Sequence, residues 1–187
     1  MGLKEIIRER RAYRSLEPVT ITDELISDLA MAAQLAPSCF NNQPWRYVFV
    51  HDKTVLNTLY SALSQGNVWA HASSLIIAVA SQVDFSCRIK GRDYYLFDTG
   101  LATGFLLLRA TELGLVAHPI AGYDEEQVKE ILHIPKSMQV ITLLILGKHA
   151  DQLSPVLSEK QQKIEKQRPE RLSFEKFAFV NSYRNPI

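Results

Sequence analysis

Hydrophobic residues recur every three to four positions in several stretches of this chain, which is the spacing of one helix face. The spacing predicts helices at residues 3–10, 22–36, 52–63, about 92–113 and 124–132. Thr22, Asp52 and Asp124 stand where N-cap residues are expected, and Gly114 stands at a C′ position. Pro37 follows the second predicted helix and is expected to end it.

Short apolar runs predict strands between these helices. They cover residues 46–50, 75–80, 117–120 and 140–146. The run from Leu75 to Ala80 contains no polar residue, which is typical of a strand buried on both faces. Helices that alternate with a few buried strands favour an α+β or α/β sandwich.

The predicted helix at about 92–113 is apolar on more than one face, from Tyr94 to Leu108. A helix that is apolar most of the way round is expected to be buried most of the way round. A domain of this size has little material to cover it, which favours a second subunit. A central core helix is the alternative interpretation.

The composition changes after Lys148. Residues 149–171 are polar with little apolar periodicity, whereas Phe174, Phe177, Phe179 and Val180 form an apolar tail. We therefore divide the chain into a domain at residues 1–148 and a C-terminal extension at residues 149–187, which we expect to pack on the body or on a partner.

The overall composition is that of an ordinary globular protein. Of 187 residues, 47% are hydrophobic and 22% are charged, and the formal net charge is +1. A charge this small gives no general attraction to nucleic acid or to a membrane. Two cysteines, Cys39 and Cys87, are too few for a disulfide framework and lack metal-ligand spacing. The N-terminal segment is charged throughout, so we expect a cytoplasmic protein.

Common catalytic signatures are missing from the sequence. It has no Gly-x-Ser-x-Gly elbow, no Walker loop, no Gly-x-Gly-x-x-Gly after a strand and no His-x-x-x-His or Cys-x-x-Cys pair. We expect no metal, and we expect the histidines to be surface or satisfied core residues. Gly100 and Gly104 lie four apart in a predicted helix, where close packing is the expected reason for them.

Four arginines stand within seven residues at the end of the first predicted helix: Arg8, Arg10, Arg11 and Arg14. Cations there complement the negative end of the helix dipole. The same guanidinium groups could instead bind phosphate oxygens through paired hydrogen bonds. A nucleic-acid role is disfavoured because residues 1–14 also contain Glu5 and Glu9, and Tyr13 is the one aromatic there that could stack on a base.

Several further motifs stand along the chain in the order in which they occur in one protein family. They are Arg10-Arg11-Ala12-Tyr13-Arg14, Pro37-Ser38-x-x-Asn41-x-Gln43-Pro44-Trp45, Asp98-Thr99-Gly100, Gly114-Leu115 and Pro119 to Asp124. With them the chain resembles the FMN-dependent nitroreductases from about residue 4 to residue 148. The resemblance implies an α+β fold, with a central, mostly antiparallel sheet flanked by helices. It also implies an interlocked homodimer with two FMN molecules in the interface.

The resemblance also implies a set of cofactor-binding residues: Arg10, Arg11, Ala12, Arg14, Pro37, Ser38, Cys39, Asn41, Asn67, Ala121, Gly122 and Arg171, with Arg168 as a companion. Arg10, Arg11 and Arg171 resemble phosphate ligands, and Arg14 the cation near flavin N1 and O2. Residues 37–41 match a loop that reaches the partner's flavin. Asn67 matches an amide beside the pyrimidine edge, and residues 121–122 a turn whose N–H faces flavin N5.

Some positions depart from the family pattern. Ala12 stands where many relatives have serine, and Ala70 where some have a second cation. Cys39 and Phe40 replace smaller polar residues in the loop, and the role of Cys39 is left open. Larger members insert helices between positions equivalent to Ser81 and Tyr94, so a short segment there implies an open pocket.

The activity implied by the resemblance is hydride transfer from NADPH or NADH to a small electron-poor acceptor, such as a nitroaromatic or a quinone, by a ping-pong mechanism. No side chain is expected to be catalytic, because flavin N5 carries the chemistry and Arg14 tunes it. Two alternatives stay open: another flavin chemistry, such as reductive dehalogenation or dehydrogenation, and a flavin-binding module without turnover. The sequence names neither the physiological acceptor, the preferred nicotinamide nor the pathway.

Overall fold

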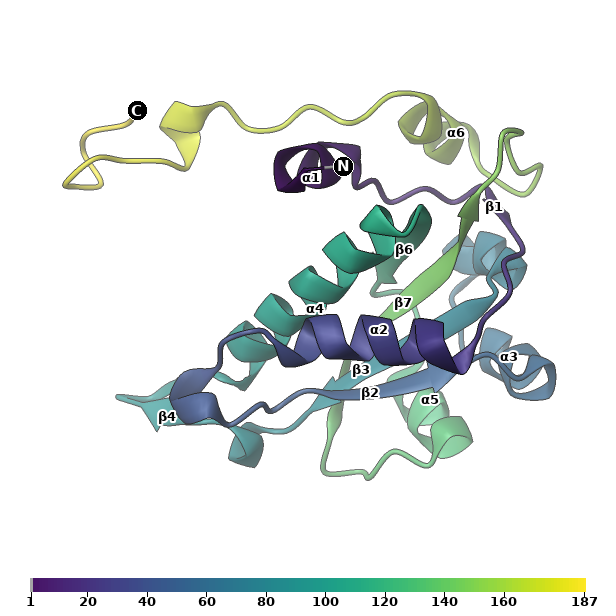
Figure 1. Ribbon diagram of the computed structural model, residues 1–187, viewed down its shortest axis with the longest axis horizontal. Helices are drawn as coiled ribbons and strands as arrows, with labels where there is room; N and C mark the ends of the chain where they lie inside the picture. Colours follow the sequence, from purple (N-terminus) through teal and green to yellow (C-terminus); the bar gives the residue numbers. More distant parts are fainter. Residues whose placement is uncertain (1) are drawn as a thin grey trace.

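A five-stranded antiparallel sheet organises the chain in the computed structural model, which describes residues 2–187. The long strand β7 (Gln139–His149) lies between β3 (Leu75–Ser81) and β6 (Leu115–Ile120), and β2 (Arg46–Val50) pairs with β3. The short strand β1 (Leu16–Glu17) pairs with the end of β7. The α+β fold expected from the sequence is therefore confirmed (Figure 1).

Two layers of helices cover the two faces of the sheet. On one face, α2 (Asp23–Gln34) and α4 (Tyr95–Glu112) pack on Leu75, Ile77 and Val79. On the other face, α3 (Lys53–Tyr60) and α5 (Glu125–Leu132) share a core with Ile76 and Ala78. Alternate residues of β3 thus enter two different cores, which is the physical reason for its unbroken apolar run.

The predicted helix starts follow the capping residues. The side chains of Thr22, Asp52 and Asp124 each accept a backbone hydrogen bond at the start of α2, α3 and α5. Helix α1 (Leu3–Glu9) also forms as predicted. The fourth helix begins later than expected, because Arg92–Asp93 form strand β5, which pairs with β4 (Arg88–Ile89).

The extension contains a helix that the sequence pattern did not predict, α6 (Glu159–Lys166). It begins with a capping box between Ser158 and Gln161. Apolar periodicity failed to find it because the residue that this helix buries is charged, Glu165. Short 3-10 turns lie at Cys39–Asn41, Gln65–Ala72, Val83–Phe85 and Phe174–Lys176.

The sequence did not predict that the two cysteines pair with each other. Cys39 and Cys87 form a disulfide across 48 residues of sequence, and they join the loop after α2 to the segment before β4. Two cysteines are too few for a framework, but they are enough for a single cross-link between loops that the fold brings together.

The expectation of close packing at Gly100 and Gly104 was also wrong within one chain. A Cβ added at either glycine would meet no atom within 4 Å. On the same helix, Leu96, Phe97 and Phe105 are exposed. The described chain therefore leaves one face of α4 uncovered.

No helix in residues 2–187 is long and apolar enough to cross a membrane.

Candidate functional site

The arginine motif lies in an extended segment between α1 and β1. Helix α1 ends at Glu9, and Arg10 leaves the helix with an extended ψ of 116°. Residues 10–15 then run beneath α6 before entering the sheet at Leu16 (Figure 1). Because this segment is extended, its side chains are fixed by contacts with other elements rather than by a helix.

Glu165 of α6 holds this segment. Its carboxylate accepts the backbone N–H of Arg14 at 3.0 Å and that of Ser15 at 2.8 Å. The side chain of Glu165 is only 2% exposed. A buried carboxylate that accepts two backbone donors is a strong, charge-assisted anchor, so the C-terminal extension fixes the path of the arginine motif.

Arg11 strengthens the same contact from the other side. Its guanidinium donates to the carbonyls of Ile164 and Glu165 at 2.7 and 3.1 Å, and to the hydroxyl of Tyr13 at 3.2 Å. It also lies over the Tyr13 ring, 4.5 Å from the centroid. Two of the five N–H donors of Arg11 thus bind the end of α6.

The remaining arginines converge on one pocket. Arg10, Arg14, Arg168 and Arg171 line a cavity of about 130 Å³ together with residues 11–12, 164 and 169. No acidic side chain lines it among the residues that the structure describes. Burial lowers the pKa of Arg10, and the charges of Arg168 and Arg171 lower it further. Like charges gathered without a carboxylate between them favour an anion at this place.

Arg168 has a second role in the pocket. Its guanidinium donates to the backbone carbonyls of Arg8 and Arg10. The end of α1 therefore receives a cation from the extension, which compensates the carbonyls that a helix end leaves free. Arg171 makes only a long contact, 3.5 Å, with the carbonyl of Pro169, so its guanidinium remains available.

Arg14 is a half-buried cation of the motif. Its Nη1 atom is inaccessible to solvent and has no hydrogen-bond partner. The guanidinium lies 5.8 Å from the centroid of the buried Trp69 ring, whose Nε1 also has no partner. Burial lowers the pKa of Arg14, and the Glu165 carboxylate opposes this shift. Orphaned buried donors are rare, so a ligand with acceptor atoms would satisfy this position.

Two histidines pack behind the motif. Tyr13 stacks on His149 with ring centroids 3.6 Å apart. His118 is buried, and its Nδ1 lies 3.0 Å from the carbonyl of Tyr13. Burial lowers the pKa of His118 to about 4, although the Tyr13 carbonyl acts in the opposite direction. As expected for a satisfied core histidine, His118 is neutral at pH 7.

We predict that this histidine makes the protein less stable in acid. Its pKa is lower in the folded chain than in the unfolded one, so the unfolded state binds the proton first and the stability present above pH 6.5 is lost as the pH falls toward 4. Between pH 6.5 and 5 the expected loss is about 1.5 kcal/mol. Urea unfolding at several pH values measures it.

The matched variant is His118→Asn, which retains a small polar donor but does not titrate. Its stability should vary less steeply with pH over this interval than that of the wild type. Equal slopes would show that another group causes the acid sensitivity.

A second group of expected residues meets at the turn after β6. The side-chain amide of Asn67 donates to the carbonyl of Gly122 at 2.9 Å, and the N–H of Ser64 donates to the same carbonyl at 3.0 Å. A Cβ at Gly122 would collide with Ser64 Oγ and Asn67 Nδ2. Glycine therefore leaves room for these two side chains, which would have to move away from the 121–122 turn if a Cβ were present.

The third group, residues 37–41, lies elsewhere in the same chain. The disulfide ties Cys39 to the β4 end of the molecule, whereas the arginine motif leads into β1 at the other end (Figure 1). The N–H of Cys39 donates to the buried carboxylate of Asp98, and Ser38 Oγ accepts from the N–H of Gln43. A single chain thus does not bring this loop to the arginine pocket.

Sequence reasoning missed the residues that support the pocket from behind. Glu165 and Ile164 lie in a segment that we treated as polar with little apolar periodicity, and Trp69 carries no sequence signal of its function. The one available sign was the capping box at Ser158 and Gln161, which marks the start of α6.

The fold and the pocket define an α+β protein with a cationic site at the edge of its sheet. The sequence model of the Nitroreductase family matches residues 7–68 and 59–148. The chain belongs to the nitroreductase family.

Relatives and solved structures agree with this assignment. A protein of Archaeoglobus fulgidus named as an NADH dehydrogenase/NAD(P)H nitroreductase is 31% identical over 152 residues, which is 79% of this chain and 86% of that protein. A nitroreductase family protein of Clostridium novyi NT superposes with a TM-score of 0.75 at 26% identity, over 81% of this chain and 87% of that one. A structure described as an oxidoreductase containing FMN gives a TM-score of 0.84 at 24% identity, over 99% and 94%.

Proposed function

We propose that this protein is an FMN-dependent oxidoreductase that transfers hydride from NADPH or NADH to a small electron-poor acceptor. The observation that carries the proposal is the pocket in which Arg10, Arg14, Arg168 and Arg171 converge with no carboxylate in the lining, together with the buried, unpaired Nη1 atom of Arg14. The names of relatives that refer to NAD(P)H and the FMN-containing structural neighbour support the proposal.

The residues present fit FMN. The arginine pocket would hold the phosphate, because its volume of about 130 Å³ is several times that of a water molecule and its lining is cationic. The orphaned Nη1 of Arg14 would donate to the flavin ring. Asn67 keeps its amide oxygen free while its Nδ2 holds Gly122, so this pair would face the polar edge of the ring.

When bound, FMN would supply the hydride acceptor and donor, which no side chain provides. The chain's own residues would orient and tune it. Arg14 would place a positive charge near the ring and would favour its more negative, reduced form. Arg10 and Arg171 would hold the phosphate, and Glu165 fixes the backbone from which Arg14 projects.

The direct test is the absorption spectrum of the purified protein after reconstitution with FMN. We expect a yellow protein whose flavin bands are bleached by NADPH or NADH and restored by a quinone or a nitroaromatic, with parallel double-reciprocal plots. A protein that does not take up FMN would refute the proposal. A flavin that is reduced but not reoxidised by any acceptor would instead favour a binding module without turnover.

Replacing Arg14 with glutamine is expected to lower the midpoint potential of the bound flavin by roughly 20–45 mV. Glutamine keeps a hydrogen-bond donor but removes the charge. At an effective dielectric constant of about 20, a unit charge in contact is worth about 4 kcal/mol, and partial solvent access reduces this to about 1–2 kcal/mol. Titration of the FMN-saturated variant by dye equilibration measures the shift. A midpoint within a few millivolts of the wild type would contradict the electrostatic role of Arg14.

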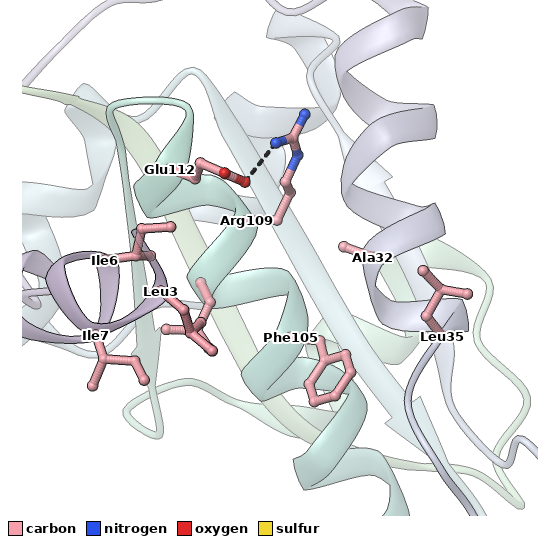
Figure 2. A pocket seen from close by; sticks show the side chains of 9 residues that line it. Leu3, Ile6, Ile7, Ala32, Leu35, Phe105, Arg109 and Glu112 are labelled. Atoms are coloured by element: carbon pink, nitrogen blue, oxygen red, sulfur yellow. Dashed lines mark hydrogen bonds and ion pairs between the residues drawn. The ribbon is translucent and has the colours of Figure 1, made fainter. Parts of the chain in front are cut away.

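We further propose that two copies of this chain form an interlocked homodimer. The uncovered face of α4 carries exposed Phe97 and Phe105 beside glycines that leave open space. Figure 2 shows the adjoining apolar pocket of about 510 Å³ between α1, α2 and α4, lined by the exposed side chains of Leu3, Ile7 and Leu35. Apolar surface of this extent favours burial against another molecule.

The dimer would also complete the flavin site. Residues 37–41 are remote from the arginine pocket of their own chain (Figure 1), so a partner subunit would have to supply this loop. The apolar residues of the tail are exposed as well: Leu172, Phe174, Phe177, Val180, Tyr183 and Ile187. We infer that they pack on the partner.

A substitution on the uncovered face of α4, which carries Gly100 and Gly104, tests the proposed dimer. Gly100→Glu should not disturb the fold of one chain, because nothing lies within 4 Å of the added Cβ. It should nevertheless convert a dimer into a monomer by placing a charge in the interface, a cost of several kcal/mol. Sedimentation equilibrium measures the mass, and Asn57→Glu on the exposed surface of α3 is the control. A holo-monomer of the wild type at micromolar concentration would contradict the proposal.

A further inference from the structure

The disulfide lies beside the most unusual backbone of the chain. Phe40, Asn41 and Gln43 have φ values of 49°, 58° and 48°. None of them is glycine, and such residues adopt left-handed conformations only at a cost in free energy. This conformation therefore persists because the surroundings impose it, and the covalent bond at Cys39 lies within four residues of all three.

Few other contacts hold this loop. Its hydrogen bonds are short-range: Asn41 N–H to the Ser38 carbonyl, Asn42 N–H to the Cys39 carbonyl, and Gln43 N–H to Ser38 Oγ. Two hydrogen bonds join the loop to other elements: the Cys39 N–H donates to the carboxylate of Asp98 at 3.2 Å, and the Arg46 guanidinium of β2 donates to the Gln43 carbonyl at 3.0 Å.

The other end of the disulfide is attached in a similar way. Ser86 Oγ donates to the same Asp98 carboxylate at 2.6 Å, and the Phe85 ring lies 4.5 Å below the Arg46 guanidinium. Beyond Cys87, the ion pair between Arg88 and Asp93 stays within the β4–β5 hairpin. The disulfide thus joins a strained loop to a hairpin that projects from the body.

We propose that Cys39 and Cys87 are a thiol–disulfide exchange site whose oxidised form holds residues 38–43 in the conformation that binds FMN. Both cysteines are only half-buried, and their neighbours Phe40 and Arg88 are exposed, so a small thiol can approach. The coupling to FMN rests on the proposed function, in which residues 37–41 reach the flavin of the partner.

The exchange balances with two equivalents of a low-molecular-weight thiol. One thiolate attacks a protein sulfur, the bond between Cys39 and Cys87 breaks, and the other cysteine leaves as a thiolate that takes up a proton. A second thiolate then attacks the mixed disulfide and releases the second cysteine. The protein gains two electrons and two protons, and the small thiol becomes its own disulfide.

Reduction removes the covalent link but leaves the hydrogen bonds to Asp98. The left-handed residues can then relax to ordinary conformations, and the loop loses the order that it has before a ligand binds. A loop that must be ordered on binding lowers affinity, so the reduced protein should bind FMN more weakly.

The test begins with the thiols themselves. Alkylation of the unfolded wild type followed by mass spectrometry should give no modified cysteine after air oxidation and two after treatment with dithiothreitol. Folded samples are then digested with trypsin, because the hairpin presents Arg88, Lys90 and Arg92 to solvent. We expect at least fivefold faster cleavage there in the reduced protein, reversed by reoxidation.

The double variant Cys39→Ser/Cys87→Ser provides the reduced geometry without a reductant. It should be cleaved at the fast rate with or without dithiothreitol, and its FMN dissociation constant should be at least fivefold higher than that of the oxidised wild type. Two free thiols after oxidation, or equal FMN affinity in the two forms, would overturn the inference. If neither form binds FMN, the proposed function fails, and the trypsin result alone then decides: a rate that depends on dithiothreitol supports the exchange site, and an unchanged rate overturns it.

Discussion

Glu165→Ala is expected to lower the free energy of unfolding by about 2–4 kcal/mol and to weaken FMN binding at the same time. The wild-type carboxylate accepts the N–H groups of Arg14 and Ser15 and is 2% exposed. Alanine leaves the buried N–H of Ser15 and the partly buried N–H of Arg14 unpaired; a buried unpaired donor costs about 1–3 kcal/mol, and a partly buried one costs less. The arginine motif loses its anchor, so its guanidinium groups no longer converge.

Urea unfolding of the FMN-free protein measures the first effect, and titration with FMN measures the second. Lys166→Ala is the matched control, because this neighbour on α6 is exposed. Glu165→Gln separates hydrogen bonding from charge, since it keeps an acceptor oxygen and should lose less stability than the alanine variant. If Glu165→Ala were as stable as Lys166→Ala, the carboxylate would not anchor the motif.

Arg10→Ala is expected to weaken FMN binding by about 1.5–3 kcal/mol, the range for a hydrogen bond to a charged group. This corresponds to a dissociation constant roughly 10- to 150-fold higher. Arg10 lines one pocket with Arg168 and Arg171; burial lowers the pKa of Arg10, and the charges of the other two arginines lower it further. These three cations repel one another until a phosphate compensates them, so the loss of one removes a direct ligand.

Riboflavin makes this experiment specific, because it carries the same ring without the phosphate. The variant should lose affinity for FMN and keep its affinity for riboflavin. Arg8→Ala is the control, since the Arg8 side chain is exposed and does not line the pocket. An equal loss of affinity for FMN and riboflavin would show that Arg10 does not contact the phosphate. Wild-type affinity of the variant for FMN would show that Arg10 is not part of the site.

The predictions that succeeded depend on local signals. The caps at Thr22, Asp52 and Asp124 act within one helical turn, and an unbroken apolar run such as that of β3 is typical of a strand covered by helices on both faces. The expected start of α4 was too early because Arg92 and Asp93 pair with β4, a choice that depends on the neighbouring strand.

Part of the candidate site could likewise be predicted from the sequence, and part depends on the tertiary structure. The motif around Arg10, Arg14 and Asn67 could be recognised because its residues stand in order along the chain. The structure brings Arg171 to the pocket of Arg10, and it brings Asn67 to Gly122. It gives Arg11 a further function, since its guanidinium binds the carbonyls at the end of α6.

The sequence by itself determined the α+β class, the strands buried on both faces, most helix boundaries and the family to which the chain belongs. Only the tertiary structure decided that Glu165 anchors Arg14 across about 150 residues, that Cys39 meets Cys87, and that Arg14 Nη1 has no partner. The physical reason is the range of the interactions. Caps and periodicity act between neighbours in sequence, whereas the pairing of a buried charge depends on which distant segments the sheet and the extension bring into contact.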